Sequence, residues 1–209
     1  MNIDRRNWIL SQCKQGERIL DIGSANGWIF YGTELNVIRV DLDEYDLPNF
    51  YRMDAHDLKF PDKFFDVAVL GEILEHVKDP VKVLSEAKRV AHRLVITVPD
   101  EANWAKELYP YETLEQSLQR QGVKTRLELA KIGNPNAKSF YDGDNMDHLW
   151  HHRHYTRETL EEDLKKAGLN YNIEVLQYDG WSFFCVTAKE LPLYRQYLEG
   201  KIKEGRCLL

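Results

Sequence analysis

Cysteine is scarce in this chain of 209 residues, which contains three. Cys13, Cys185 and Cys207 are odd in number and widely separated, so the chain lacks the paired cysteines of a disulfide-stabilised protein. We interpret them as inert thiols in a reducing compartment, which predicts a cytoplasmic location and gives no reason to expect a nucleophilic cysteine. With 43% apolar residues, the chain can bury one sizeable core without disulfides.

Long apolar runs and an excess of positive charge are also lacking. No stretch approaches the roughly eighteen apolar residues of a membrane-spanning helix. The amino-terminal segment MNIDRRNWILSQCKQGERIL lacks the apolar core and cleavage site of a secretory signal, so we expect neither secretion nor a membrane span. The formal net charge of -6 argues against a nucleic-acid partner, which normally selects a basic face.

The glycine-rich motifs that bind phosphate are absent as well. The run ERILDIGSANG reads as a strand over residues 18–22 that ends in a turn bracketed by Gly23 and Gly27. The dinucleotide fingerprint G-x-G-x-x-G would need glycine where Ala25 and Trp28 stand. A P-loop fails at Trp28 too, and no Lys-Ser or Lys-Thr pair follows it. These mismatches disfavour both NAD and ATP as ligands.

Acidic side chains are present where the next two strands are expected to end. Asp41 ends the largely apolar strand expected at 37–40 and lies about eighteen residues after Gly23, near the spacing at which an acidic residue binds ribose hydroxyls in α/β sheets. We expect Asp21 and Asp54 to add negative charge to the same rim. S-adenosylmethionine fits this pattern, because it has an adenosine, no phosphate and a positively charged sulfonium.

Five segments then resemble one known family, in its order and near its spacing. They are ERILDIGSANG, VIRVDLD, MDAHDLKFPDKFFDVAVLGEILEHVKDP, LVITVPD and HHRHYTRETLEEDLKKAGL. From Glu17 to about Pro99 the chain resembles a class I S-adenosylmethionine-dependent methyltransferase of the small-molecule branch, similar to ubiquinone, menaquinone and sugar methyltransferases. The resemblance implies a doubly wound, mostly parallel, seven-stranded α/β sheet of the Rossmann-like methyltransferase type, with a lid inserted after the fifth strand.

The resemblance also implies which residues bind S-adenosylmethionine. They belong to the turn and to the ends of the first four strands: Asp21, Gly23, Ser24, Ala25, Gly27, Asp41, Leu42, Asp54, Ala55, His56 and Gly71. In the family the pair at Asp54 and Ala55 meets the adenine. His56, which comes next, either packs on the adenine or is an ordinary surface histidine.

The chain departs from the family pattern at three places. Ala25 replaces a third glycine, which narrows the backbone freedom of the turn. A Pro-Gly-Gly turn before the fifth strand is missing, since Val90 leads directly through Ala91 and His92 into RLVITVP. That connection must be tight. We also expect the helix after Gly27 to be short, because residues 28–36 are all that separate the turn from the next strand.

One domain over residues 1–209 accounts for the whole pattern. We divide it into a core of about 1–100 and 156–190, a lid of about 101–155 and a tail of 191–209. Alternating strand and helix patterns indicate a parallel sheet. We expect strands at 50–53, 65–70 and 94–98, a helix at 80–90 capped by Asp79, a helix from Thr156 to Gly168, and a hairpin of 171–178 and 181–188 joined at Asp179 and Gly180.

Histidines gather in one short segment of the chain. A hydroxyl acceptor loses a proton when it is methylated, and histidine is a natural base near neutral pH. His151 matches the first position of the family's H-x-R-x-[YF]-T pattern, so His151, and His148 one turn earlier, are our candidate bases. For His152 and His154 we favour structural packing.

A metal site in that segment is an alternative that we do not favour. Asp147 and His151 are four residues apart, but the cysteine spacing of strong zinc sites is absent. We therefore predict no metal ligands. Arg153 and Tyr155 of the same family pattern are expected to anchor the segment rather than to react.

Acidic residues follow the fourth expected strand, where reacting groups lie in this type of fold. Glu72 is our third candidate catalytic residue, because it can face the acceptor. For Glu75 and His76 we favour a role at a helix start and in local hydrogen bonds. The sequence Asn-Pro-Pro-Tyr of base-amine methyltransferases is absent, which disfavours methylation of DNA amines.

The acceptor is the least specified part of the prediction. We favour O-methylation of a sugar or quinone-like hydroxyl, with N-methylation of an amino sugar or protein side chain, or a non-catalytic cofactor-binding partner subunit, as alternatives. Basic residues of the lid either meet an anionic acceptor or form a solvated helix face: Arg120, Lys124, Arg126, Lys131 and Lys138. A homodimer is left open.

Overall fold

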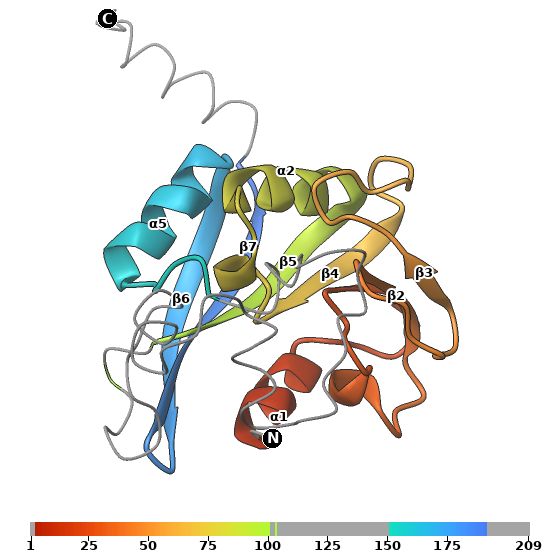
Figure 1. The fold of residues 1–209 in the computed structure, drawn as a ribbon, viewed down its shortest axis with the longest axis horizontal. Helices are drawn as coiled ribbons and strands as arrows, with labels where there is room; N and C mark the ends of the chain where they lie inside the picture. Colours follow the sequence, from red (N-terminus) through yellow and green to blue (C-terminus); the bar gives the residue numbers. More distant parts are fainter. Residues whose placement is uncertain (1–2, 101–102, 104–150, 192–209) are drawn as a thin grey trace, which may run out of the picture.

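A single seven-stranded sheet organises the part of the chain that the computed structural model describes, which is residues 3–100, 103 and 151–191. The strand order is β3-β2-β1-β4-β5-β7-β6 (Figure 1). Neighbouring strands are parallel except for β7, which runs antiparallel to both β5 and β6. The strands are β1 (Arg18–Ile22), β2 (Asn36–Asp41), β3 (Phe50–Arg52), β4 (Phe65–Gly71), β5 (Ala91–Pro99), β6 (Leu169–Tyr178) and β7 (Trp181–Glu190).

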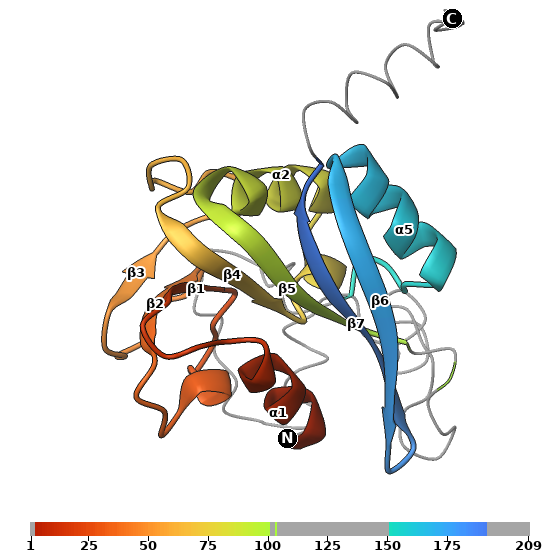
Figure 2. The ribbon, with the colours of Figure 1, turned by 180° about the vertical axis from the view of Figure 1, so that it is seen from behind.

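The helices divide between the two faces of this sheet, as Figures 1 and 2 show. α2 (Pro80–Val90) and α5 (Arg157–Lys166) cover one face, where Leu84, Leu160 and strand residues form the larger apolar cluster. α1 (Ile3–Ser11) and the 3-10 turn η1 (Trp28–Phe30) cover the other, where Ile9 and Phe30 pack against strand residues. Helices on both faces explain why β4 and β5 are nearly continuous apolar runs. The predicted doubly wound α/β fold is confirmed.

The chain passes from α2 to β5 with no residue between them, which confirms the predicted tight connection. Asp79 caps the amino end of α2 by accepting a hydrogen bond from the Lys82 N–H at 2.9 Å. The helix ends at Val90, and β5 begins at Ala91, whose N–H still bonds to the Ala87 carbonyl. The last turn of the helix therefore leads directly into the sheet.

The predicted hairpin and last helix are also present. Asp179 and Gly180 join β6 to β7 with φ values of 47° and 81°, as a two-residue turn with two left-handed positions requires. Thr156 and Thr159 form a reciprocal capping box at the start of α5. The hairpin supplies the antiparallel strand that completes the sheet.

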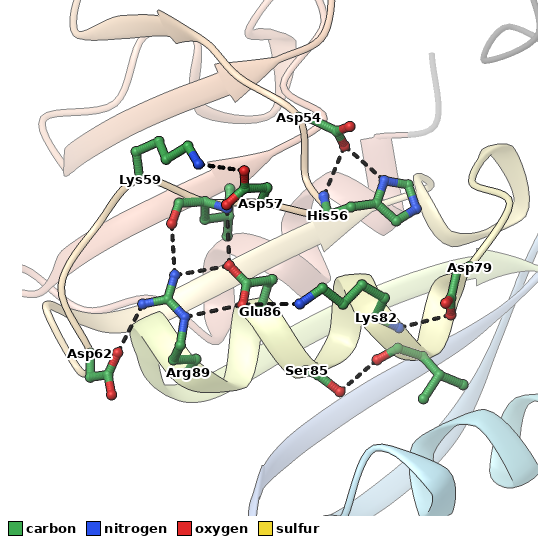
Figure 3. A network of polar contacts seen from close by, with 12 residues as sticks. Asp54, His56, Asp57, Lys59, Asp62, Asp79, Lys82, Ser85, Glu86 and Arg89 are labelled. Carbon is green, nitrogen blue, oxygen red and sulfur yellow. Dashed lines mark hydrogen bonds and ion pairs between the residues drawn. The ribbon is translucent and has the colours of Figure 1, made fainter.

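The loop after β3 is fixed to α2 by a network of polar contacts, drawn in Figure 3. The Arg89 guanidinium donates to the Phe60 and Leu58 carbonyls at 2.8 and 2.7 Å and pairs with Glu86. Glu86 in turn accepts from the Leu58 N–H at 3.0 Å, and these hydrogen bonds, those from Arg89 first, hold its pKa below the ordinary value. The loop that begins at Asp54 thus has a rigid base.

The sequence patterns did not predict α1, whose Ile9 is fully buried against the sheet. Most of the expected lid, residues 101–102 and 104–150, and the tail from 192 onward lie outside the described residues. None of the described helices is long and apolar enough to cross a membrane.

Candidate functional site

A cavity of about 550 Å³ opens at the carboxyl ends of β1, β2 and β4. The strand order reverses between β1 and β4, and ligands of open α/β sheets bind at such a switch point. Its volume is in the range of small-molecule sites. Eight of the residues predicted from the sequence line it: Gly23, Ala25, Asp41, Leu42, Asp54, Ala55, His56 and Glu72.

The turn after β1 is shaped by left-handed backbone and by one carboxylate. Gly23 and Ala25 have φ values of 71° and 43°, and a Cβ on Gly23 would lie 2.7 Å from the Ile73 Cδ1 atom. Ala25 carries the cost of a left-handed conformation because it has a side chain. The Asp41 Oδ2 atom accepts from the Ala25 N–H at 2.8 Å, and Oδ1 accepts from the Asp43 N–H at 3.0 Å. Asp41 therefore holds the turn closed.

Four of the predicted cofactor residues do not line the cavity: Asp21, Ser24, Gly27 and Gly71. Glycine relieves close packing at the last two, since an added Cβ would lie 3.0 Å from the Leu47 Cδ1 atom at Gly27, where φ is also 71°, and 2.6 Å from the Ile29 Cδ1 atom at Gly71. Ser24 is buried in the turn itself. These four residues therefore support the backbone of the cavity wall and do not line the cavity itself.

Asp21 is not on the rim that we expected it to share with Asp54. It is fully buried in β1, on the sheet face of Ile19, which α1 covers. Burial raises its pKa from 3.8 to about 7; the guanidinium of Arg39 opposes this shift and the carboxylate of Asp41 adds to it. At neutral pH, Asp21 therefore contributes less negative charge than the sequence suggested.

Asp54 and His56 form a local pair at the far side of the cavity. The Asp54 Oδ1 atom lies 2.8 Å from the His56 backbone nitrogen and 2.7 Å from its Nδ1 atom (Figure 3). Partial burial favours the neutral acid, but these bonds outweigh it and hold the pKa of Asp54 below its ordinary value. The carboxylate is thus charged and fixed in orientation.

Glu72 lies in strained backbone and lines the cavity together with Ile73 and His76, a part of the wall that we call the mouth. It follows β4 with a φ of 61°, a conformation that costs free energy in a residue other than glycine. Its side chain pairs with Arg5 of α1 at 2.8 Å, and both side chains are mostly buried. The Arg5 guanidinium also lies 4.9 Å from the Trp28 ring centroid. Sequence reasoning missed Arg5, because nothing local to it indicates a partner in another element.

We expect Arg5→Met to destabilise the protein by about 2 kcal/mol, because it leaves Glu72 partly buried beside an apolar chain. Methionine keeps the contact with Trp28, so most of the loss reflects the charge. The double variant with Glu72→Gln should recover more than half of it. Urea denaturation of the two single variants and the double variant measures this coupling. Additive effects of the two substitutions would argue against it.

The histidine segment, of which residues 151–154 are described, packs beside this mouth. The His152 N–H donates to the Glu75 carbonyl at 2.7 Å, and His152 lines the cavity. His151, the predicted base, instead stacks edge-on against His76 with centroids 4.7 Å apart. His148 lies outside the described residues.

Arg153 and Tyr155 hold the histidine segment in place, in agreement with the anchoring that we expected. Arg153 donates to the Lys78 carbonyl at 2.9 Å, and the buried Tyr155 hydroxyl donates to Asp163 at 3.1 Å. Burial and the nearby Asp163 carboxylate raise the Tyr155 pKa well above its usual range. Tyr155 therefore stays protonated as a donor.

Comparison with known proteins supports the fold and the donor. Residues 20–94 match the family model described as a methyltransferase domain, a span that runs from β1 into β5. No curated protein gives a significant match over this sequence. The domain match and the fold together indicate that the cofactor is S-adenosylmethionine.

Solved structures share this architecture at low sequence identity. A SAM-dependent methyltransferase from Methanosarcina mazei is 19% identical, with a TM-score of 0.54 over 88% of this chain and 98% of its own. One from Mesorhizobium loti is 16% identical, with a TM-score of 0.55 over 88% and 96%. The 4+2 cyclase SpnF is 14% identical, with a TM-score of 0.56 over 88% and 80%. These likenesses establish the Rossmann-like methyltransferase fold.

Proposed function

We propose that this protein transfers a methyl group from S-adenosylmethionine to a small-molecule oxygen acceptor, such as a sugar or quinone-like hydroxyl. One observation carries the proposal: a cavity at the β1–β4 switch point is bounded by a left-handed turn and by Asp41 and Asp54, with no phosphate-binding motif beside it. These features suit a cationic nucleoside.

In this proposal the residues that line the cavity fix the orientation of S-adenosylmethionine. Asp41 binds the ribose hydroxyls, while Asp54, Ala55 and His56 surround the adenine. The methionine part then lies along the turn at Gly23 and points the sulfonium toward the mouth at Glu72. The resemblance to the family supports these assignments, and all six residues line the cavity.

Methyl transfer itself asks the protein for alignment and for removal of one proton. The acceptor oxygen forms a bond to the methyl carbon as the carbon–sulfur bond breaks, and its electron pair returns to sulfur to leave a neutral thioether. The hydroxyl proton goes to a base, for which we propose His151 or His148. Glu72, tied to Arg5, is better suited to orient the acceptor than to take its proton.

Two alternatives remain as proposals of lower rank. An amine acceptor is already nucleophilic, so N-methylation of an amino sugar or protein side chain would need the same donor site with less use of a base. A non-catalytic subunit would bind the cofactor without turnover, and the SpnF structure shows that this fold is not restricted to one reaction. We propose a cytoplasmic protein whose acceptor is neutral or anionic, and which acts alone or as a homodimer.

We expect isothermal calorimetry to show one S-adenosylhomocysteine bound per chain. The product analogue has the adenosine and the methionine part that the cavity is proposed to hold. ATP and NAD should give no heat at the same concentration, because the turn lacks a phosphate-binding motif. Absence of S-adenosylhomocysteine binding would refute the enzyme and the cofactor-binding subunit together. Binding without methyl transfer from labelled donor to any sugar, quinol or amine acceptor would favour the subunit.

A further inference from the structure

Three side chains with metal-binding atoms converge beside the mouth of the donor cavity. Glu75 and His76 belong to the 3-10 turn η2 (Leu74–His76), which follows β4, and His151 comes from the segment before α5. One ligand atom from each lies within 4.8 Å of the others. The Glu75 Oε1 and His76 Nε2 atoms are 4.0 Å apart. Residues far apart in sequence thus meet at one point.

The backbone around this cluster is held firmly. The His152 N–H donates to the Glu75 carbonyl at 2.7 Å, which joins the histidine segment directly to η2. Arg153 fastens the next residues by donating to the Val77 and Lys78 carbonyls at 3.2 and 2.9 Å. His151 is therefore placed against His76 by contacts on its carboxyl-terminal side. Such second contacts are what orient the ligands of a metal site.

Two imidazoles and one carboxylate form a ligand set with a clear preference. Zinc and other divalent first-row transition ions bind these groups at about 2.0–2.2 Å, with three protein ligands and an open position in catalytic sites. Tetrahedral bonds of that length place ligand atoms about 3.4 Å apart. The observed spacing, within 4.8 Å, therefore has to contract by up to about 1.4 Å, which side-chain rotations can provide.

The position of the cluster suggests that the ion would reach the acceptor. The Glu75 side chain is 1% exposed, whereas that of His76 is 24% exposed and lines the donor cavity. A buried carboxylate supplies charge in an environment with little water. Through His76 the cluster adjoins the cavity. Glu72 lines the cavity a short way along the same chain segment.

We propose that Glu75, His76 and His151 bind a divalent first-row transition ion, such as Zn²⁺ or Mn²⁺, at the acceptor end of the cavity. This differs from our expectation that the chain has no metal ligands. That expectation considered Asp147 with His151 and assigned Glu75 and His76 to a helix start. The fold instead pairs His151 with residues that follow β4, which sequence spacing alone did not indicate.

The ion would also explain how the acceptor oxygen is activated, and this part rests on the proposed methyl transfer. A hydroxyl oxygen bound at the open position has a lowered pKa, so its proton can leave to water before the oxygen attacks the methyl carbon. In that case His151 serves as a ligand and not as the base. The proposal then favours acceptors whose oxygen can reach the ion, such as catechol-like or sugar hydroxyls.

Titration with Co²⁺ tests the site directly in the full-length protein after dialysis against EDTA. We expect one Co²⁺ per chain, with a visible absorption band that Zn²⁺ removes by competition. His76→Gln and His151→Gln should each weaken binding by about 100-fold or more, beyond the 10- to 100-fold typical of outer-shell changes. His92→Gln is the matched control, because His92 is an exposed histidine near the start of β5. It should bind Co²⁺ as the wild type does.

Two results would overturn the metal site: no stoichiometric Co²⁺ binding, or binding that His76→Gln leaves unchanged, since other histidines would then hold the ion. Both histidines are partly exposed, so these variants remain informative if Glu75→Gln fails to fold. Calorimetry with S-adenosylhomocysteine in EDTA separates this outcome from failure of the proposed function. Donor binding without Co²⁺ binding removes the metal site alone. Co²⁺ binding without donor binding removes the methyltransferase function alone.

Discussion

Asp41→Asn should lower the affinity for S-adenosylhomocysteine by about 100-fold, or about 3 kcal/mol. Two backbone donors, the N–H groups of Ala25 and Asp43, each bond to a different oxygen of this carboxylate. An amide offers one oxygen, so its NH₂ group would face one of those donors. The substitution also removes the charge proposed to accept from the ribose hydroxyls. The substitution therefore weakens both the turn and the contact with the ribose. Calorimetry measures the combined effect on affinity.

Asp57→Asn is the control for this experiment. Asp57 is an exposed carboxylate of the loop after β3 and pairs with Lys59, so it has no role in the proposed donor site (Figure 3). Its affinity for S-adenosylhomocysteine should stay within a factor of about two of the wild type. Thermal melting without ligand shows how far Asp41→Asn loosens the turn itself. If Asp41→Asn binds as tightly as the control, the assignment of Asp41 to the ribose is wrong.

The donor side of the site was predictable because its signals are local. Strand periodicity gave the bounds of β1 without error. The failed glycine spacing at Ala25 and Trp28 disfavoured phosphate ligands. Asp41 and Asp54 were placed at strand ends by counting along alternating elements, and both line the cavity. In a parallel sheet, carboxyl ends of neighbouring strands meet at one edge, so sequence order fixes spatial proximity there.

The acceptor side was not predictable, because it depends on contacts between distant segments. Arg5 pairs with Glu72 only because α1 packs on the sheet. The apolar pattern of α1 is too short to predict a helix from the sequence. His151 and His152 alternate in direction once the segment is anchored, and it is His152 that lines the cavity. The H-x-R-x-[YF]-T pattern identifies the segment but not which side chain faces inward.

Packing also set the role of the glycines and of Asp21. We assigned Gly27 and Gly71 to the cofactor, but neither lines the cavity, and an added Cβ at either position would lie close to an apolar side chain. Asp21 has the same sequence signature as a rim carboxylate, but the alternation of β1 turns it toward the face covered by α1. The sequence predicted that Asp21 lies in a strand. Which face of the sheet is covered at that position depends on where α1 packs.

Asp21→Asn should remove a loss of stability that the wild type suffers as the pH rises from 5 to 8. Burial raises the pKa of Asp21 in the folded protein to about 7, above the ordinary value of 3.8. The folded state therefore binds the proton more tightly than the unfolded state, and the stabilisation it gives is complete below pH 3.8 and lost as the pH rises through about 7. From pH 5 to 8 the wild type should lose about 3 kcal/mol relative to the variant.

The readout is the difference in pH dependence and not the absolute stability of either protein. A buried asparagine carries its own desolvation cost, but that cost is the same at pH 5 and pH 8 and cancels in the comparison. Urea denaturation at both pH values, for the wild type, Asp21→Asn and the exposed control Asp57→Asn, supplies the measurement. Equal pH dependence in the wild type and Asp21→Asn would mean that Asp21 is already ionised in the fold at pH 5. The carboxylate would then have a partner strong enough to offset complete burial, and Arg39, the cation that lowers its pKa, is the residue to replace next.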